Sequence, residues 1–133
     1  MDKLTPEKRS RLMSRVRGRD TKPELAVRRM LHMMGFRYRL HRGDLPGRPD
    51  IVFVSRKKVI FVHGCFWHGH RCARGKLPTT NTDFWRDKIG RNMIRDHKSL
   101  RQLRKMGWSA LVVWECTLKN SVATQRRIVD FLR

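Results

Sequence analysis

Acidic residues and long apolar stretches are both scarce in this 133-residue sequence. Only 11 Asp and Glu stand against 32 Lys and Arg, which gives a formal net charge of +21 at pH 7. The longest apolar runs, residues 51–54 and 59–62, are far too short to cross a bilayer. The chain starts Met-Asp-Lys-Leu-Thr-Pro and shows no apolar signal peptide. We therefore expect a cytoplasmic protein without membrane contact.

Cysteine is also rare. Three cysteines are too few for a disulfide framework, and their number is odd. In a reducing compartment they are better interpreted as metal ligands than as disulfide partners. The large positive charge, with an isoelectric point near 11.6, indicates a polyanionic partner, and nucleic acid is the first candidate. A basic protein without that role, or a ribosome-associated one, is the alternative.

The rest of the sequence predicts one α/β domain over residues 1–133, with a central sheet flanked by helices. The length suits a single compact domain, and 39 % of the residues are hydrophobic. Apolar periodicity predicts helices over residues 6–17, 22–34, 83–106 and 122–132. Apolar β-branched runs and an alternating segment predict strands over residues 36–40, 51–54, 59–62 and 110–115.

The helix over residues 22–34 carries a capping box, with Thr21 at the N-cap and Glu24 three residues later. Its predicted buried face is Leu25, Ala26, Met30, Leu31 and Met34. The helix over 83–106 has apolar residues at spacings of three, four or seven: Trp85, Ile89, Met93, Leu100, Leu103 and Met106.

A hairpin between residues 51–54 and 59–62 would bring a carboxylate to a histidine. Closure across residues 55–58 predicts the opposed pairs Val54–Val59, Val52–Phe61 and Asp50–His63. Opposed residues point to the same face, with Cβ atoms roughly 5 Å apart. An aspartate facing a histidine in a basic protein is a candidate functional site.

Cysteines and histidines are crowded into residues 62–72. Cys65, His70 and Cys72 lie in one short loop, and Cys116 follows a strand that should run parallel to residues 59–62. Together they form the ligand set of a closed structural zinc site. His63 or His68 could replace His70. We favour His70 because wrapping the loop brings its far part to the metal.

The two remaining histidines, with Asp50, form a second predicted cluster. A neutral histidine can act as a general base near pH 7. An aspartate and a nearby backbone carbonyl can hold Mg²⁺, which also takes phosphate oxygens. Asp50, His63 and His68 therefore suit a phosphodiester hydrolase. The alternative is a polar cluster with a structural role only.

Four collinear motifs carry a family resemblance. They are Pro-Gly-Arg-Pro-Asp at 46–50, Phe-Val-His-Gly-Cys-Phe-Trp-His-Gly-His-Arg-Cys at 61–72, Phe-Trp-Arg-Asp-Lys-Ile-Gly-Arg-Asn at 84–92 and Val-Trp-Glu-Cys at 113–116. Over residues 10–116 the chain resembles the bacterial very short patch repair (Vsr) DNA mismatch endonucleases. The resemblance implies a restriction-endonuclease-like fold. It also implies nicking 5′ of the thymine in T·G mismatches that arise from 5-methylcytosine deamination.

The resemblance also implies roles for individual residues. Asp50 and the backbone carbonyl of Val62, where the family often has threonine, would hold Mg²⁺. His68 would be the general base, His63 would contact the scissile phosphate, and Glu24 would join the active site. The zinc ligands would be the four residues chosen above: Cys65, His70, Cys72 and Cys116.

The DNA contacts implied by the resemblance come from aromatic and polar side chains. Phe66, Trp67 and Trp85 would wedge into the duplex from the major groove, and Met13 would enter from the minor groove. We expect Phe66 and Trp67 to be held outward, since two adjacent aromatics on a loop cannot easily both point inward. Lys88 and Asn92 are candidates for contacts to base edges. The basic N-terminal residues 1–20 would track phosphates.

The implied partner is double-stranded DNA with a T·G mismatch, in the bacterial cytoplasm at the nucleoid. Mismatch-repair proteins are candidate partners, and we expect a monomer because nicking one strand needs only one copy. Two alternatives are a restriction-type nuclease that cuts matched duplex and a zinc-stabilised DNA-binding module without catalysis.

Overall fold

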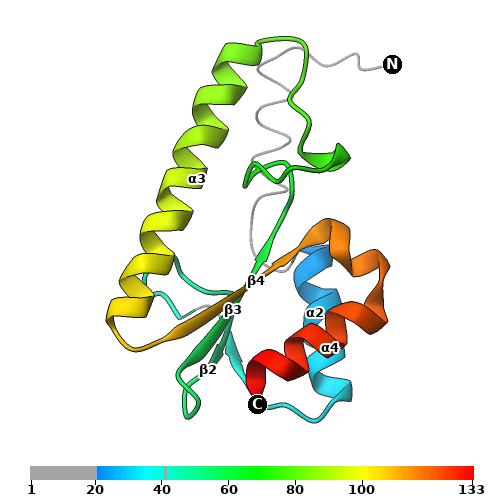
Figure 1. The fold of residues 1–133 in the computed structure, drawn as a ribbon, viewed down its shortest axis with the longest axis vertical. Helices are drawn as coiled ribbons and strands as arrows, with labels where there is room; N and C mark the ends of the chain where they lie inside the picture. The colour runs from blue at the N-terminus through cyan, green and yellow to red at the C-terminus, as the bar shows by residue number, and fades with distance from the viewer. Residues whose placement is uncertain (1–20, 41) are drawn as a thin grey trace.

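The computed structural model describes residues 21–40 and 42–133. The basic helix predicted over residues 6–17, with Met13, lies outside them. Within the described part, four strands form one mixed sheet that α-helices flank on both faces (Figure 1). The predicted α/β arrangement with a central mixed sheet is confirmed for these residues.

The sheet has the strand order β1-β2-β3-β4. β1 pairs antiparallel with β2, β2 pairs antiparallel with β3, and β3 pairs parallel with β4. The bounds are Arg39–Leu40 for β1, Ile51–Phe53 for β2, Lys58–His63 for β3 and Ser109–Trp114 for β4. β1 is shorter than the predicted strand over residues 36–40. The predicted parallel pair is confirmed, so β3 and β4 both end at one edge of the sheet.

The helices form two layers around the sheet. α2 (Lys22–Met33) and α4 (Ser121–Leu132) lie on one face, and α3 (Thr82–Lys105) lies on the other (Figure 1). Because strand side chains alternate, Ile60 packs in the cluster with α2 and α4, whereas Val59 packs with Leu103 of α3. This two-sided burial confirms what the continuous apolar runs predicted.

α2 begins at the predicted cap, and its predicted buried face is confirmed in part, since Leu31 is buried and Met30 and Met34 pack half-buried against the core. The Thr21 hydroxyl oxygen accepts the Glu24 N–H at 3.4 Å. Val27 and Leu31 are fully buried, and Glu24 is only 5 % exposed. Leu25, predicted to be buried, is 38 % exposed. Spacings of three and four from Glu24 set the buried stripe, which turns the Glu24 side chain into the protein.

The hairpin register differs from the prediction by two residues. The observed pairs are Ile51–Ile60, Val52–Val59 and Phe53–Lys58. The loop closes one residue earlier because Lys57 takes a left-handed conformation (φ 52°) and donates its N–H to the Val54 carbonyl. The predicted Asp50–His63 opposition is therefore wrong. A shift of two residues preserves the face, so both side chains remain on the same side of the sheet.

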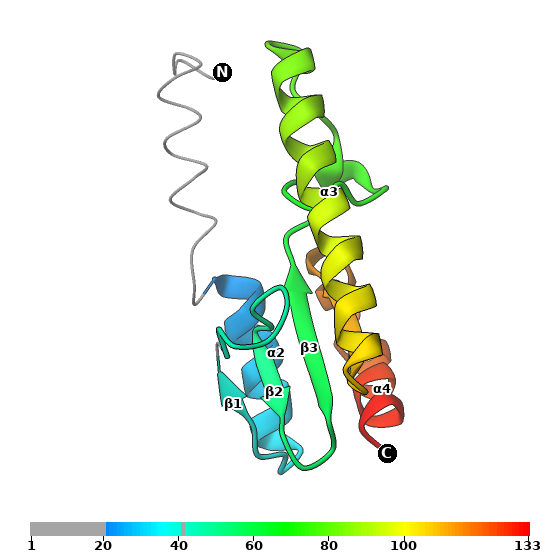
Figure 2. The ribbon, with the colours of Figure 1, turned by 90° about the vertical axis from the view of Figure 1, so that its left-hand side faces the viewer.

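α3 is longer than the sheet that it covers. Its 24 residues span about 36 Å, against about 20 Å for the six residues of β3. Its C-terminal half packs on the sheet through Leu103, and its N-terminal half extends beside the loop over residues 64–81 (Figure 2). Met93 and Met106, predicted to lie in the buried stripe, are 38 % and 49 % exposed. No helix in the described ranges is long and apolar enough to span a membrane.

Candidate functional site

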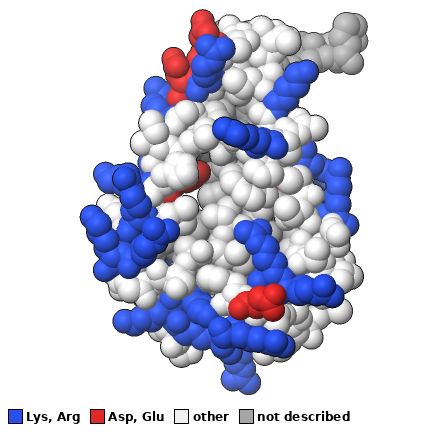
Figure 3. Space-filling model, viewed as in Figure 1, with Lys and Arg blue, Asp and Glu red and all other residues white. Residues whose placement is uncertain are grey.

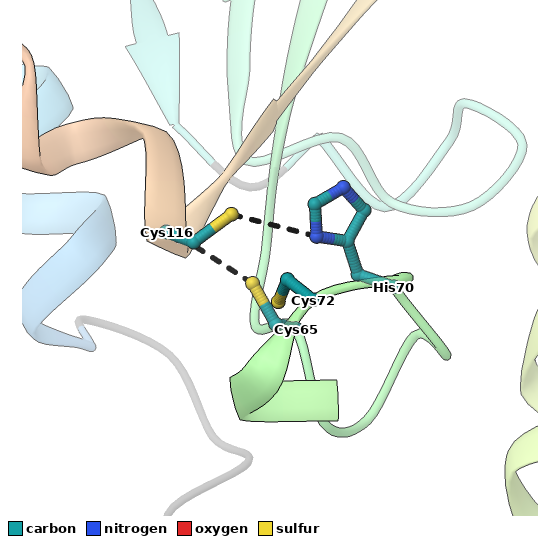
Figure 4. Close-up of side chains that lie close together, drawn as sticks. All are labelled: Cys65, His70, Cys72 and Cys116. Atoms are coloured by element: carbon teal, nitrogen blue, oxygen red, sulfur yellow. Dashed lines mark hydrogen bonds between the residues drawn. The ribbon is translucent and has the colours of Figure 1, made fainter. Parts of the chain in front are cut away.

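Three cysteines and one histidine converge where β3 and β4 end (Figure 4). Cys65, His70 and Cys72 lie in the loop after β3, and Cys116 lies in the short helix η2 (Glu115–Lys119) after β4. Their ligand atoms all lie within 4.8 Å of one another. The parallel strands therefore bring Cys116 to the loop, as the sequence predicts. We refer to these four residues as the metal cluster.

The loop that carries this cluster is shaped by its backbone. The His70 N–H donates to the Cys65 carbonyl at 3.0 Å, and the Cys72 N–H donates to the His70 carbonyl at 2.9 Å. Gly69 has φ 66°, and a Cβ there would collide with a side chain of α3. A Cβ on Gly75 would collide with the His70 carbonyl oxygen. Glycine permits this tight wrapping, which directs His70 towards the cysteines.

The donor set of the metal cluster suits Zn²⁺. Three thiolates and one imidazole are ligands of closed tetrahedral zinc sites. Cys65 is fully buried, and this burial raises the pKa of its thiol to about 12. A buried thiolate therefore needs an adjacent cation. Four protein ligands leave no position for a catalytic water, so a metal held here would be structural.

A groove of about 930 Å³ opens beside the metal cluster, lined by parts of α2, β3, α3 and the loops between them. The side chains in its lining that can hold a cation or move a proton are Glu24, Asp50, His63, His68, Asp96 and Glu115. The structure thus brings the four predicted catalytic residues, Glu24, Asp50, His63 and His68, into one cavity.

Asp50 lies in the groove, and no ion pair links it to a Lys or Arg in the part of the chain that the structure describes. Its Oδ2 accepts the Val62 N–H at 2.7 Å. Burial raises the pKa of Asp50 to about 7, and the Glu24 carboxylate adds to this, whereas the Val62 N–H and Arg28 oppose it. Arg28 pairs with Glu24 at 3.1 Å. A divalent cation beside Asp50 would offset the cost of its buried charge, so the site fits a hard cation with oxygen ligands.

The two histidines left outside the metal cluster lie against each other. The rings of His63 and His68 stack with centroids 3.7 Å apart and planes 2° apart. His68 Nδ1 lies 2.6 Å from Asp96 Oδ2, so the carboxylate that orients His68 is Asp96 rather than Asp50. His63 is 6 % exposed, and its Nδ1 has no hydrogen-bond partner among the described residues. Burial and the neighbouring His68 lower the pKa of His63 to about 3, which keeps its imidazole neutral.

Asp96 is the functional residue that the sequence reading missed. It lies four residues after Asn92 and seven after Ile89, on the stripe of α3 that faces the loop and groove. An acidic residue in a helical stripe that is otherwise buried could have singled it out, because such a group needs a partner. Its actual partner, His68, is 28 residues away along the chain.

The aromatic residues expected to reach DNA pack together in this structure. Trp85 is 3 % exposed and Trp67 is 9 % exposed, and both contact Ile89 in one cluster with Phe66 at its border. The expectation that Phe66 and Trp67 point outward is therefore wrong for Trp67, because the extended N-terminal half of α3 provides an apolar surface beside the loop. Lys88 lies over the Trp67 ring at 5.6 Å from its centroid.

Asn92 is buried and already engaged. Its Nδ2 donates to the Trp67 carbonyl at 3.0 Å, and its Oδ1 accepts from Arg95 at 2.7 Å. It is only 4 % exposed. A contact from Asn92 to a base edge would need the second amide N–H or the second lone pair of Oδ1 to be uncovered, or one of these bonds to be replaced.

Basic side chains outnumber acidic ones on the surface. Figure 3 shows Lys and Arg gathered mainly on the left side and along the lower part of the face seen in Figure 1, whereas the upper central part is largely uncharged. Such a surface attracts the phosphate backbone of a nucleic acid.

Comparison with known proteins connects this geometry to DNA cleavage. The sequence model of the family described as DNA mismatch endonuclease Vsr matches residues 1–74. The chain is 51 % identical over 131 residues to the type II nicking enzyme V.XorIIP of Xanthomonas oryzae, covering 98 % of this chain and 96 % of that relative. It is 44 % identical over 119 residues to the DNA mismatch endonuclease Vsr of Escherichia coli, covering 90 % of this chain and 74 % of that relative.

A third relative extends the comparison to both ends of the chain. The type II nicking enzyme V.NmeAIP of Neisseria meningitidis is 46 % identical over 132 residues, covering 99 % of this chain and 94 % of the relative.

Proposed function

The chain belongs to the Vsr family of DNA mismatch endonucleases and is a DNA endonuclease, and from this premise we propose that it nicks one strand 5′ of the thymine in T·G mismatches. The cleavage would depend on Mg²⁺ and would initiate very short patch repair after 5-methylcytosine deamination. The observation that carries the proposal is the groove in which Glu24, Asp50, His63 and His68 meet. The fold is proposed to be restriction-endonuclease-like.

The carboxylates of the groove are proposed to form the cation site. Asp50, together with the backbone carbonyl of Val62, would hold Mg²⁺, and Glu24 would complete the negative surroundings. The raised pKa of Asp50 supports this role, because a bound cation would favour its ionised form. When bound, Mg²⁺ supplies charge stabilisation to the phosphodiester and to the attacking water.

The two histidines of the groove, His63 and His68, are proposed to contact the phosphate and to accept a proton. Asp96 orients His68 through Nδ1, which leaves Nε2 to take a proton from the attacking water as a general base. His63 is neutral and buried, and its Nδ1, which has no partner among the described residues, can donate to, or accept from, a group that enters the groove. We propose that this group is the scissile phosphate or its water.

The cluster formed by Phe66, Trp67 and Trp85 is proposed to open when DNA binds. Phe66, Trp67 and Trp85 would then enter the duplex beside the mismatch, where unstacking costs least because pairing is already imperfect. Lys88 and Asn92 would contact base edges after leaving their present partners. Met13, which lies outside the described ranges, keeps its proposed contact from the minor groove.

The metal cluster is proposed to hold a structural Zn²⁺ through Cys65, His70, Cys72 and Cys116. Its place between the ends of β3 and β4 supports this role, because one metal would tie the loop that carries His68 to the sheet. We further propose a monomer that acts in the bacterial cytoplasm at the nucleoid and contacts mismatch-repair proteins. The alternative of a DNA-binding module without catalysis is not retained, because the relatives are nucleases.

The experiment that tests the function compares DNA duplexes that differ at a single base pair. The protein is incubated with Mg²⁺ and strand-labelled DNA that carries T·G, T·A or C·G at one position. We expect nicking of the T strand alone, and only in the T·G duplex. Cleavage of both strands of matched DNA would support a restriction-type nuclease instead, and absence of cleavage in all three duplexes would contradict the proposal.

A further inference from the structure

The loop that precedes Asp50 is held rigidly at the rim of the groove. The Arg48 N–H donates to the Leu45 carbonyl at 3.1 Å, which closes a turn with Pro46 second and Gly47 third. Gly47 has φ 77°, the value that a type II turn needs at this position. A Cβ on Gly47 would lie only 2.8 Å from the Ser99 Cβ of α3. Leu45 is 5 % exposed, so the loop is packed against the domain.

Arg48 is held in an unfavourable backbone conformation at the centre of this loop. Its φ is 48°, a left-handed value that glycine or asparagine adopts more readily than arginine. Its side chain is exposed, and no hydrogen bond or ion pair links that side chain to any described residue. Among the described residues, the guanidinium therefore makes no hydrogen bond or ion pair that would stabilise the fold. Strain of this kind at a cavity rim points to a functional reason for the side chain.

The charge of the groove supplies such a reason. Four carboxylates line it: Glu24, Asp50, Asp96 and Glu115. Among the described residues, the lining holds two Lys or Arg residues, Arg48 and Arg95, and Arg95 already donates to Asn92. Within the described residues, Arg48 is thus the one cationic side chain of the lining without a partner. A phosphodiester entering among these carboxylates needs a donor of positive charge.

We propose that Arg48 binds a backbone phosphate of the nicked strand and thereby sets the position of the scissile bond against Asp50 and His68. A guanidinium offers parallel N–H donors that match two phosphate oxygens, which lysine cannot reproduce. Because residue 48 lies two positions before Asp50 in a rigid loop, the phosphate that it holds is placed at a constant distance from that carboxylate. The inference rests on the proposed nuclease function and adds a substrate-contacting residue to it.

The variants Arg48→Asn and Arg48→Lys test this role. Asparagine removes the charge and tolerates the left-handed conformation, so we expect an unchanged or raised melting temperature. Lysine keeps the charge but loses the two-pronged contact. The matched control is Arg127→Gln on α4, an exposed arginine on a helix that contributes nothing to the groove.

The measurement is a double-mutant cycle, in which a change in the protein is combined with a change in the DNA. Affinity for the T·G duplex is measured with Ca²⁺, and phosphates of the T strand are replaced one at a time by neutral methylphosphonate. Arg48→Asn should weaken binding about tenfold, lower the slope of log affinity against log salt by about one, and abolish the penalty of one particular methylphosphonate. Arg48→Lys should recover the salt slope but restore single-turnover nicking with Mg²⁺ only partly.

The inference would be overturned by binding of Arg48→Asn within twofold of wild type, or by methylphosphonate penalties that add to the Arg48→Asn penalty at every position. An effect of the same size in Arg127→Gln would reassign Arg48 to general charge attraction and also overturn it. The binding cycle does not depend on cleavage. If the wild-type protein fails to nick the T·G duplex, the proposed function fails while the cycle still decides whether Arg48 holds a phosphate.

Discussion

The metal cluster and the groove lie at the same end of the sheet, yet their polar groups are arranged differently. In the metal cluster, four ligand atoms lie within 4.8 Å of one another and face inward. In the groove, Asp50 carries a strongly raised pKa and His63 Nδ1 has no partner among the described residues. Ligands that converge on one enclosed point suit a structural metal, whereas perturbed and unpaired groups around an open cavity suit chemistry.

The two regions are joined by a few residues of one loop. His68 and His70 are separated only by Gly69, whose φ of 66° sends the two imidazoles in different directions. Trp114, at the end of β4, stacks on His70 with centroids 4.2 Å apart and meets the His63 ring edge-on at 5.2 Å. Loss of the metal should therefore disturb the groove, whereas loss of a groove residue should leave the metal cluster intact.

The largest expected effect removes the charge of Asp50. In Asp50→Asn the amide oxygen can still accept the Val62 N–H, so the fold should persist. Without the carboxylate, we expect single-turnover nicking to fall by roughly 10³-fold, with the metal held by the metal cluster unchanged and the melting temperature no lower than that of wild type. Nicking within tenfold of wild type would exclude Asp50 as the cation ligand, and an unfolded variant would make it structural.

Cys116→Ser should affect the metal cluster rather than the groove. Removing one of four ligands should lower the free energy of unfolding by on the order of 3 kcal/mol and reduce the bound metal in parallel. Chemical denaturation and elemental analysis measure the two losses. Ala73→Ser, in the same loop but outside the cluster, is the control. One metal per chain still held tightly by Cys116→Ser would mean that the fourth ligand is misassigned.

The pH dependence of stability separates Asp50 from the cluster. Its folded pKa of about 7 lies above the ordinary value of 3.8, so the native state binds a proton more tightly than the unfolded state between these values. Wild-type stability therefore falls as pH rises through that window. From pH 5 to 8, without added Mg²⁺, the stability of Asp50→Asn relative to wild type should rise by roughly 2–3 kcal/mol. Denaturation curves at several pH values measure this, and a constant difference would contradict it.

The smallest expected effect concerns the orientation of His68. Asp96→Asn should weaken the hold on His68 Nδ1 and lower the nicking rate about tenfold, with DNA affinity and metal content unchanged. Asp83→Asn, at an exposed acid in the first turn of the same helix, is the matched control. Equal losses in the two variants would show that the charge of α3, rather than the contact to His68, is responsible.

Local patterns in the sequence predicted much of the frame. The strand assignments at residues 51–54 and 59–62 hold because apolar β-branched runs can be buried on both faces of a sheet. The convergence of Cys116 with Cys65 follows from one topological rule, since parallel strands end at the same edge. The hairpin register was predicted wrongly because Lys57 adopts a left-handed turn conformation. Nothing in the local sequence Ser-Arg-Lys-Lys indicates that conformation.

The residues themselves thus determined which groups can bind metal, where the strands lie and how strongly the surface attracts polyanions. Only the tertiary structure decided that Asp96 meets His68, that Trp67 packs under α3, and that Arg48, at the rim of the groove, has no partner among the described residues. These features depend on α3, which is longer than the sheet, and on the loop over residues 64–81, which lies beside that helix. Contacts between such distant segments are set by packing geometry, which leaves little periodic trace in the chain.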